Sequence, residues 1–406
     1  MELLVTRMGA QGDGVAEGPD GPLFVPYALP GELVRVARDG ERMRLDEVLA
    51  PSVARVAPVC RHFGRCGGCL LQHWDLAPYF AWKRGLVVEA LARERVAAAV
   101  GLVVDAHGAG RRRVIFHARQ YGAKTVVGFA ERKSHAMVDL AECPVLAPDL
   151  DQALPAARAV AQALAGAKKP LDIQVVASAT GLDLDVRGSG PLPPALLMDL
   201  AALAERFGLA RVTRHGELVL QRAAPVLMMG RARVELPPAA FLQATAEGEA
   251  GLAAAVGQGV AGAKRVADLF AGIGTFALRL AERARVHAVE GNAAAVTALL
   301  KAARATDGLK GVSGEARDLF RRPLLPEELS AFDAVVIDPP RQGAEAQARQ
   351  LAAATVGRVV YVSCSAASFA RDARALIDGG FRLGTVTPFD QFRFSPHVEL
   401  VGVFER

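Results

Sequence analysis

A lone cysteine, Cys364, lies where a buried apolar strand gives way to a helix, in VVYVSCSAASFARD (residues 359–372). Ligands of α/β sheets bind at the carboxyl ends of the strands, so a thiol there is placed to meet a bound molecule. The N-terminus of the predicted helix would favour the thiolate form of Cys364. An isolated cysteine in a strand is usually an inert buried thiol, and only this location marks Cys364 as a candidate nucleophile. The serines that flank it have no predicted role.

A glycine turn in DLFAGIGTFAL (residues 268–278) predicts a site for a nucleotide-like ligand. Gly272 and Gly274 allow a tight turn and a close approach of the backbone to a ligand. A nicotinamide dinucleotide prefers the fuller GxGxxG loop, and Asp268 just before the turn would repel its pyrophosphate. S-adenosylmethionine has no phosphate and carries a positive sulfur, which Asp268 suits. A tight strand-to-helix connection without a ligand is the simpler interpretation of the turn alone.

Acidic residues follow the next three predicted strands. Glu290 ends the strand in VHAVEGN, Asp318 follows GVSGEA, and Asp338 follows DAVVI. An acidic residue at the position of Glu290 can accept hydrogen bonds from ribose hydroxyls. Since the strand ends share one edge of the sheet, three carboxylates there are hard to explain as a core. We therefore expect S-adenosylmethionine as the cofactor.

The DPP sequence after the fourth strand also occurs in methyltransferases that act on exocyclic amines, which need no cysteine. Methylation of a pyrimidine at C5 does need one, because C5 is a poor nucleophile until a thiolate adds to C6. A base must then remove the C5 proton so that the thiolate can leave. Glu399, in SPHVELVGVF, is the candidate base, although alone it would be interpreted as an ordinary exposed strand residue. A cytosine-C5 enzyme shares this chemistry but usually places its cysteine directly after a proline, which Cys364 lacks.

The other four cysteines form a separate pattern. CRHFGRCGGCLLQH gives C-x5-C-x2-C with Cys60, Cys66 and Cys69, and Cys143 lies downstream in VDLAECPVL. In a reducing compartment, clustered cysteines bind metal more often than they form disulfides. Four thiolates can hold either zinc or an iron–sulfur cluster, and the spacing does not choose between them.

The composition predicts a soluble, cytoplasmic protein of two or three domains. The chain has 406 residues, of which 51% are hydrophobic and 22% charged, so it can bury ample core. No apolar run approaches the ~20 residues of a membrane span, and the amino terminus lacks the pattern of a signal peptide. The net charge of +5 mildly favours a polyanionic partner.

Three domains of an α/β protein are predicted. Residues 1–56 alternate short apolar runs with Gly, Pro and Asp, which predicts a small β-barrel; the segment resembles the TRAM domain, an OB-like module of RNA-modifying enzymes. Residues 57–238 combine a helix with several strands in a mixed α/β central domain. Residues 239–406 alternate strands and helices and close with two further strands, FRLGTVTPFD and VELVGVFER. That pattern predicts a doubly wound, Rossmann-like class I methyltransferase domain.

The motifs DLFAGIGTF, VIDPPRQG, VYVSCSAASFARD and FSPHVELV together resemble the RNA 5-methyluridine methyltransferases, particularly the bacterial 23S rRNA branch. The resemblance spans essentially the whole chain. It implies that Cys364 is the nucleophile and Glu399 the base. FLQAT resembles the family's FxQxN, which implies that Gln243 contacts the cofactor. The cofactor positions implied in this way are Gln243, Phe270, Thr275, Glu290, Asp318 and Asp338.

The same resemblance implies a [4Fe–4S] cluster and an RNA substrate. The cluster ligands would be Cys60, Cys66, Cys69 and Cys143, with a structural or RNA-binding role, because this methyl transfer needs no electron. The target uracil must leave any stack to reach Cys364. A uridine of 23S rRNA is the expected target, a tRNA uridine is the near alternative, and a non-catalytic iron–sulfur RNA-binding protein is a distant one. No protein partner is implied, and a monomer is expected. Phosphate contacts are expected from GRRRVIFHAR, with Arg111, Arg112, Arg113 and His117.

Three positions depart from the family pattern. FLQAT has Thr245 where the family has asparagine, and Thr275 occupies a position often held by asparagine. The stretch QFRFSPHVE, which ends at Glu399, stands where family members commonly read MFPHTxHVE. These changes bear on substrate choice more than on the chemistry.

Overall fold

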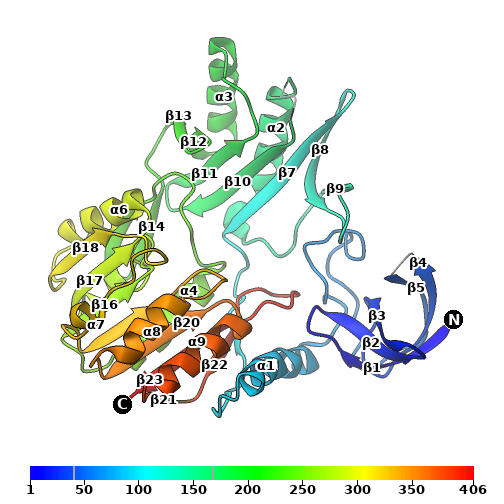
Figure 1. Cartoon of the computed structure of the whole chain (residues 1–406). Coiled ribbons are helices and arrows are strands. Elements are labelled where there is room, and N and C mark those ends of the chain that lie inside the picture. The colour runs from blue at the N-terminus through cyan, green and yellow to red at the C-terminus, as the bar shows by residue number, and fades with distance from the viewer. Residues whose placement is uncertain (40–41, 167–168) are drawn as a thin grey trace.

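The computed structural model describes residues 1–39, 42–166 and 169–406. The chain forms three lobes: the N-terminal sheet, a central α/β domain, and a C-terminal α/β domain (Figure 1). Among the described residues, none of the helices combines the length and the apolar character that a membrane crossing requires.

The N-terminal lobe is a curled five-stranded antiparallel sheet of order β3-β2-β1-β4-β5. Its small core includes Val5, Val25 and Val34, which point to the inside of the curl. The β-rich fold predicted for this segment is confirmed, in the form of a half-barrel. Its strands are β1 (Glu2–Met8), β2 (Asp13–Gly18), β3 (Gly21–Pro26), β4 (Leu33–Asp39) and β5 (Arg42–Ala50).

The segment between this sheet and the next helix carries three cysteines and forms turns and single bridges. Helix α1 (Leu76–Arg93) follows, and the Asp75 side chain caps it by accepting from the N–H of Ala77 at 2.9 Å. α1 packs against α9 (Ala366–Asp378) and β22 (Thr387–Asp390) of the C-terminal domain. The turns that carry the cysteines are therefore joined directly to a helix of the C-terminal domain's surface.

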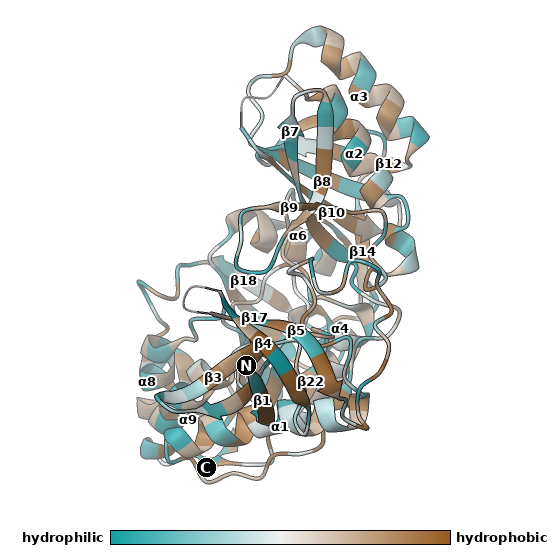
Figure 2. Cartoon of the chain, turned by 90° about the vertical axis from the view of Figure 1, so that its right-hand side faces the viewer, coloured by the Kyte–Doolittle hydropathy of each residue, from teal (hydrophilic) through white to brown (hydrophobic). Residues whose placement is uncertain are grey.

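The central domain is a seven-stranded sheet of order β13-β12-β11-β10-β7-β8-β9. Helices α2 (Ala153–Ala163) and α3 (Pro194–Arg206) pack on one face, and α3 alternates hydrophobic and hydrophilic residues along its length (Figure 2). Val114 and Phe116 of β7 are buried on that face, whereas Ile115 between them is exposed on the other. The strands are β7 (Arg113–Tyr121), β8 (Lys124–Ala130), β9 (Met137–Asp139), β10 (Leu171–Ser178), β11 (Gly181–Arg187), β12 (Leu209–Arg214) and β13 (Glu217–Gln221), and a hairpin of β14 (Val226–Met229) and β15 (Ala232–Glu235) follows.

The C-terminal domain confirms the predicted α/β fold. Its sheet has the order β18-β17-β16-β19-β20-β23-β22-β6, with β16 to β20 parallel and β23 antiparallel. Alternate residues of β19 and β20 enter two cores, one on each face of the sheet, as a doubly wound fold requires. The strands are β16 (Arg265–Leu269), β17 (Arg285–Glu290), β18 (Val312–Ala316), β19 (Ala334–Ile337), β20 (Arg358–Ser363), β21 (Arg382–Leu383), β22 and β23 (Glu399–Glu405).

Helices cover both faces of this sheet (Figure 1). The short strand β6 (Val104–Asp105) and helix α1 come from the segment 57–238 but pack onto the C-terminal domain. The domain boundaries predicted at residues 56 and 238 stay predictions. The remaining helices are η1 (Pro148–Leu150), α4 (Ala246–Gly259), α5 (Ala277–Leu280), α6 (Ala293–Arg304), α7 (Pro326–Leu329) and α8 (Glu345–Ala353).

Candidate active site

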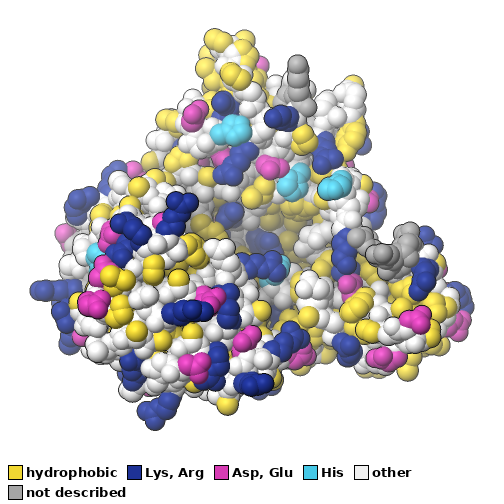
Figure 3. Space-filling view, in the orientation of Figure 1, with side chains coloured by type: hydrophobic (Ala, Val, Ile, Leu, Met, Phe, Trp, Pro, Cys, Tyr) yellow, Lys and Arg dark blue, Asp and Glu magenta, His cyan; other side chains and the backbone are white. Residues whose placement is uncertain are grey.

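A cavity of about 840 Å³ lies between the central and C-terminal domains. The space-filling view shows the surface hollowed between the three lobes, with Lys and Arg side chains in and around the hollow (Figure 3). All five cysteines line this cavity. We call the side formed by Asp338, Cys364 and Glu399 the catalytic wall. The cysteine wall is the side formed by Cys60, Cys66, Cys69 and Cys143.

Cys364 follows β20 directly and precedes α9, as the sequence predicts. The serines around it, which had no predicted role, fix this turn. The Ser365 side chain caps α9 by accepting from the N–H of Ser368 at 3.3 Å. The Ser363 hydroxyl accepts from the N–H of Ser365 at 3.1 Å. The Ser368 hydroxyl donates to the carbonyl of Arg341 at 3.0 Å, so the cysteine turn is tied to the DPPR loop.

The surroundings of Cys364 do not favour the thiolate, which corrects the prediction from its place at a helix N-terminus. Burial of the thiol, together with the nearby carboxyl groups of Glu399 and Asp338, raises the pKa of Cys364 to about 11. The Arg341 guanidinium acts in the opposite direction. The cost of burying a negative charge therefore outweighs the effect of the helix end, and the thiol is protonated at neutral pH.

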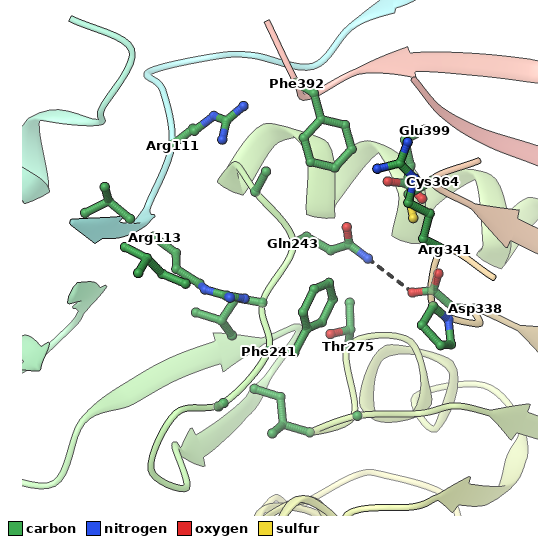
Figure 4. Close-up of a pocket in the computed structure, with 18 of the residues that line it drawn as sticks. Arg111, Arg113, Phe241, Gln243, Thr275, Asp338, Arg341, Cys364, Phe392 and Glu399 are labelled. Carbon is green, nitrogen blue, oxygen red and sulfur yellow. Dashed lines mark hydrogen bonds between the residues drawn. The ribbon is translucent and has the colours of Figure 1, made fainter. Parts of the chain in front are cut away.

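Glu399 is the first residue of β23 and is only 3% exposed, so it is not an ordinary surface residue of a strand. Burial and the neighbouring Asp338 raise its pKa well above the usual value, while a hydrogen bond from the Gln391 amide lowers it. Asp338 follows β19, and burial raises its pKa to about 7. The Gln243 amide donates to Asp338 at 3.1 Å (Figure 4). Burial thus raises the pKa of the thiol and of both carboxyl groups of the catalytic wall.

The six residues predicted to contact the cofactor all line the same cavity. Glu290 accepts hydrogen bonds from the N–H groups of Gly272 at 3.0 Å and Asn292 at 2.8 Å, so its carboxylate is fixed beside the glycine turn. Phe270 adopts a left-handed backbone conformation, with φ 61°, and its ring centre lies 5.3 Å from that of Phe320. The two rings offer apolar surface beside the carboxylates. These residues are Gln243, Phe270, Thr275, Glu290, Asp318 and Asp338.

The glycine turn behaves as predicted, and Asp268 does not. Gly272 and Gly274 have positive φ angles of 55° and 97°, a conformation that side chains rarely adopt. Asp268 is fully buried and is not among the residues that line the cavity, so it does not face a ligand. Burial and the carboxyl groups of Asp338 and Glu290 raise the pKa of Asp268 well above its usual value. The cavity nevertheless fits a cationic ligand without phosphate, because the three predicted strand-end carboxylates line it.

The four clustered cysteines converge from two segments, and all five cysteines of the chain are free of disulfides. Burial raises the pKa of Cys143 to about 12, with further contributions from Cys69, Cys66 and Cys60. The N–H groups of His62 and Gly68 each approach a cysteine sulfur at 3.4 Å, those of Cys60 and Cys66 respectively. In the part of the chain that the structure describes, no group of three or more His, Cys, Asp or Glu forms a site for a metal ion.

The backbone of two consecutive arginines links the two walls. The N–H of Arg111 donates to the carbonyl of Val145, two residues after Cys143, at 2.9 Å. The N–H of Arg112 donates to the carbonyl of Ala244, next to Gln243, at 3.0 Å. The cysteine segment and the segment that contacts Asp338 are therefore held by the same short stretch of chain.

The predicted phosphate-binding stretch divides into residues that face the cavity and residues that do not. Arg111 lies over the ring of Phe392 at 5.9 Å, and Arg113 over the ring of Phe241 at 5.7 Å, and all four line the cavity (Figure 4). Phe241 is 68% exposed, so its ring is accessible to a ligand in the cavity.

The other two residues of that stretch are engaged elsewhere. Arg112 pairs with the buried Glu249 and donates to the carbonyl of Gln243 at 3.1 Å, so it is structural. His117 pairs with Asp172 at 2.6 Å on the surface of the central sheet and is not among the residues that line the cavity. Of the four residues of this stretch, Arg111 and Arg113 are therefore the two that can contact a ligand in the cavity.

Thr245 has a structural role that explains one departure from the family pattern. It is fully buried and caps α4: its hydroxyl accepts from the N–H of Gly248 at 2.9 Å and donates to the carbonyl of Ala106 at 2.6 Å. Asparagine is an equally good cap. This substitution therefore keeps the start of the helix and leaves the cavity surface unchanged.

Sequence reasoning missed several residues of the site. Phe241 and Arg341 line the cavity and belong to the FLQAT and DPPR motifs, so each was within reach of the motif that contains it. Phe320, two residues after Asp318, also lines it. Gln391 bonds to both Glu399 and Gln243 and lies in the stretch where this chain departs from the family. The signal in the sequence was a polar residue, Gln391, at a position where the family stretch commonly has methionine.

The fold and the acid-lined cavity at the strand ends define a class I, S-adenosylmethionine-dependent methyltransferase. A family profile described as "tRNA (Uracil-5-)-methyltransferase" matches residues 251–406. An uncharacterized RNA methyltransferase of Brucella suis is 46% identical over 405 residues, covering 100% of this chain and 98% of the relative. The 23S rRNA (uracil(1939)-C(5))-methyltransferase RlmD of Chromohalobacter salexigens is 36% identical over 426 residues, covering 100% of this chain and 89% of the relative.

The fold is also similar to a solved structure over its whole length. The Pyrococcus abyssi tRNA (uracil-54, C5)-methyltransferase, in complex with S-adenosyl-L-homocysteine, superimposes with a TM-score of 0.76 at 21% identity, covering 100% of both chains. Because these relatives are 36% and 46% identical over the whole chain, the chain belongs to the S-adenosylmethionine-dependent RNA uracil-C5 methyltransferase family.

Proposed function

We propose that this enzyme forms 5-methyluridine in 23S rRNA, with Cys364 as the nucleophile and Glu399 as the base. The observation that carries the proposal is the catalytic wall: a thiol and a buried carboxyl group line one cavity together with the predicted cofactor residues. Direct transfer to an exocyclic amine would leave Cys364 without a function.

The residues of the catalytic wall supply each step. The Cys364 thiol loses its proton to solvent, and the thiolate adds to C6 of the uracil, so that the C5–C6 double-bond electrons form an enolate and make C5 a nucleophile. S-adenosylmethionine, when bound, supplies the methyl group that C5 takes. Glu399 then removes the C5 proton, the electrons of that C–H bond form the C5–C6 double bond, and the C6–S bond breaks to release Cys364. Asp338, Glu290 and Asp318 favour a cationic cofactor beside the substrate.

The protonation of Cys364 fits this order of events. A thiol with a pKa of about 11 is nearly inactive as a nucleophile at neutral pH. A positive sulfonium in the same cavity would lower the pKa of Cys364, because an opposite charge nearby stabilises the thiolate. The empty enzyme is thereby protected from side reactions of an exposed thiolate, and binding of the cationic cofactor activates it.

We further propose that Cys60, Cys66, Cys69 and Cys143 hold a [4Fe–4S] cluster. Support comes from their position on one wall and from N–H groups that approach two of the sulfurs. A zinc ion would hold four sulfurs at ~2.3 Å, far closer together than a cluster of four irons does. Zinc is therefore the alternative occupant, and metal and sulfide analysis of the purified protein distinguishes the two.

The choice of 23S rRNA rests on the relative named for that activity, which this chain matches over its full length. A tRNA uridine is the second candidate, because the matching family profile is described by tRNA and the superimposed structure is a tRNA enzyme. In both cases the target base must leave its stack to enter the cavity. The neighbouring nucleotides could then contact two cations and two aromatic rings that line the cavity, those of Arg111, Arg113, Phe241 and Phe392.

The test offers the purified enzyme S-adenosylmethionine with a labelled methyl group and, separately, unmodified 23S rRNA and unmodified tRNA. The product nucleosides are separated and the modified position is mapped. Labelled 5-methyluridine in 23S rRNA is the expected result. Labelled 5-methyluridine only in tRNA would shift the substrate assignment, whereas label in methylcytidine or methyladenosine would overturn the uracil assignment.

A further inference from the structure

A buried amide, that of Gln391, connects the catalytic wall to the predicted cofactor residues. Gln391 is fully buried between β22 and β23. Its amide nitrogen donates to the carboxyl of Glu399 and to the amide oxygen of Gln243, each at 2.8 Å. Its oxygen accepts from the N–H of Ala244 at 3.1 Å. Both donors of the amide are therefore used inside the active site.

The contacts of Gln391 fix the direction of a longer chain of hydrogen bonds. Because the oxygen of Gln243 accepts from Gln391, the nitrogen of Gln243 is left to donate, and it does so to Asp338 at 3.1 Å. The row Glu399, Gln391, Gln243 and Asp338 thus has one consistent orientation. An apolar side chain at position 391 would leave both the Glu399 carboxyl and the Gln243 oxygen without this donor.

The fold is built around this amide. A Cβ at Gly248 of α4 would lie 2.7 Å from the Gln391 oxygen, so glycine leaves the space that the amide occupies. On one side of Gln391, Asp390 is buried and paired with Lys83 of α1 and with Arg393. On the other side, Lys83 donates to the carbonyl of Phe392 at 3.2 Å. These contacts hold the backbone before and after Gln391 and limit the movement of its side chain.

We propose that Gln391 is a positioning residue for removal of the C5 proton: its amide holds the Glu399 carboxyl in place and ties it to Gln243. The inference rests on the proposed function and adds a residue to it. Gln391 acts through Glu399 and touches neither the thiol nor the target base. It occupies the first position of QFRFSPHVE, where the family stretch commonly has methionine.

The hydrogen bond also favours the charged form of the base. Burial and Asp338 raise the pKa of Glu399, and the N–H of Gln391 lowers it. Without that donor the pKa would rise further, and less carboxylate would be present at neutral pH. Addition of Cys364 to C6 and methyl transfer precede this step and do not need the Glu399 carboxylate, so they should still occur. The covalent intermediate between Cys364 and the methylated base should then persist.

The test measures kcat and KM of the wild-type enzyme and of Gln391→Met with ordinary uridine RNA and S-adenosylmethionine, at pH values from about 5.5 to about 9. We expect kcat near neutral pH to fall about 10- to 100-fold, less than the ~10²- to 10⁴-fold contribution of a general base, and the acidic limb of its pH profile to move up by about one unit. KM for RNA should stay within about twofold. A covalent protein–RNA complex that resists denaturant should accumulate. The rate of adduct formation with 5-fluorouridine RNA should match wild type, since that adduct forms before proton removal.

Two further variants separate positioning from general damage. Gln347→Met removes an equally buried amide, which bonds to the backbone of Leu324 at 2.8 and 3.1 Å and lies outside the cavity. It should lower the melting temperature without moving the pH profile. Gln391→Glu keeps the size of the side chain but loses the amide donors, and it should give the same shift of the acidic limb if Gln391→Met does not fold.

The outcomes are distinct. A folded Gln391→Met enzyme with the pH profile of wild type and no covalent complex would overturn the positioning role, and so would a loss of 5-fluorouridine adduct formation. A wild-type enzyme that makes neither 5-methyluridine nor an adduct would instead refute the proposed function itself.

Discussion

The two walls of the cavity are built in different ways. On the catalytic wall, Asp338 and Cys364 each follow a strand of one sheet directly, and Glu399 begins the antiparallel strand beside them. On the cysteine wall, three cysteines come from turns before α1 and the fourth from a segment after β9. The first wall inherits its geometry from a regular sheet. The second depends on a few contacts between loops.

Those contacts are individually modest. The ring nitrogen of His62 accepts from the N–H of Ala141 at 3.1 Å, and the N–H of Gly67 donates to the carbonyl of Ala130 at 3.0 Å. A bound cluster would add four strong bonds to this arrangement and stabilise it. The comparison therefore predicts that damage to the catalytic wall stops the chemistry and leaves the fold intact, while damage to the cysteine wall loosens the fold and affects the chemistry indirectly.

The largest effect is expected from Cys364→Ser. Loss of the thiol removes the addition to C6, and methyl transfer should fall by at least about 10⁴-fold. Because the turn is held by Ser363, Ser365 and Ser368 and not by the thiol, the melting temperature should stay within a few degrees of wild type. Labelled methyl transfer and thermal unfolding measure the two quantities. Substantial residual activity in this variant would remove Cys364 from the mechanism.

The next effect is expected from Glu399→Gln. The amide is a poor base, so kcat should fall about 10²- to 10⁴-fold, and the covalent complex with ordinary uridine RNA should accumulate. Glu405→Gln, at the exposed end of the same strand, where the carboxylate pairs with Arg358 at 2.9 Å, is the matched control and should behave as wild type. Loss of activity without a covalent complex would mean that Glu399 acts before methyl transfer.

A smaller effect on activity is expected from Cys66→Ser. The variant should lose its iron and the broad visible absorbance of the cluster, unfold at a lower temperature, and lose about 10- to 100-fold in activity. Iron and sulfide analysis of the purified protein measures the first change. Cys364→Ser is the control and should keep its full iron content. A colourless wild-type protein loaded with zinc would contradict the cluster proposal.

The last prediction involves no substitution and no loss of activity, and concerns the chemical reactivity of Cys364 in the wild-type enzyme. The rate of alkylation of Cys364, followed by mass spectrometry of its peptide, should rise with pH around a pKa of about 11 in the free enzyme. S-adenosylmethionine should move this midpoint down by about 1 to 3 units, because its sulfonium is positive, whereas S-adenosylhomocysteine should move it much less. Equal shifts with both compounds would show that the positive charge does not activate the thiol.

The sequence predicted most of what the regular sheet determines. Glu290 ends its strand, and Asp318, Asp338 and Cys364 follow theirs. β-branched residues recur in these strands except β18, and parallel strands bring their ends together without further information. The fold class follows from the same alternation. The roles of Cys364 and Glu399 could be proposed because the chemistry at C5 needs both a nucleophile and a base.

What the sequence did not predict depends on contacts between distant segments. The protonation of Cys364 is set by Glu399 and Asp338, whose distance from the thiol is not visible in the chain. Asp268 is buried in a strand whose neighbouring residues are buried on both faces of the sheet, and the sequence does not show that its carboxyl group stays out of the cavity. Gln391 looked like a change in a loop, and only its burial between two strands reveals the amide as part of the site.

The most direct test of the central claim is covalent trapping with 5-fluorouridine RNA and S-adenosylmethionine. Fluorine at C5 cannot be removed as a proton, so the complex should stop after methyl transfer with the RNA bonded to the enzyme. Digestion and mass spectrometry should then find the modified nucleotide on the peptide that contains Cys364 and no adduct in Cys364→Ser. A stable adduct on another residue, or one that persists in Cys364→Ser, would contradict the account.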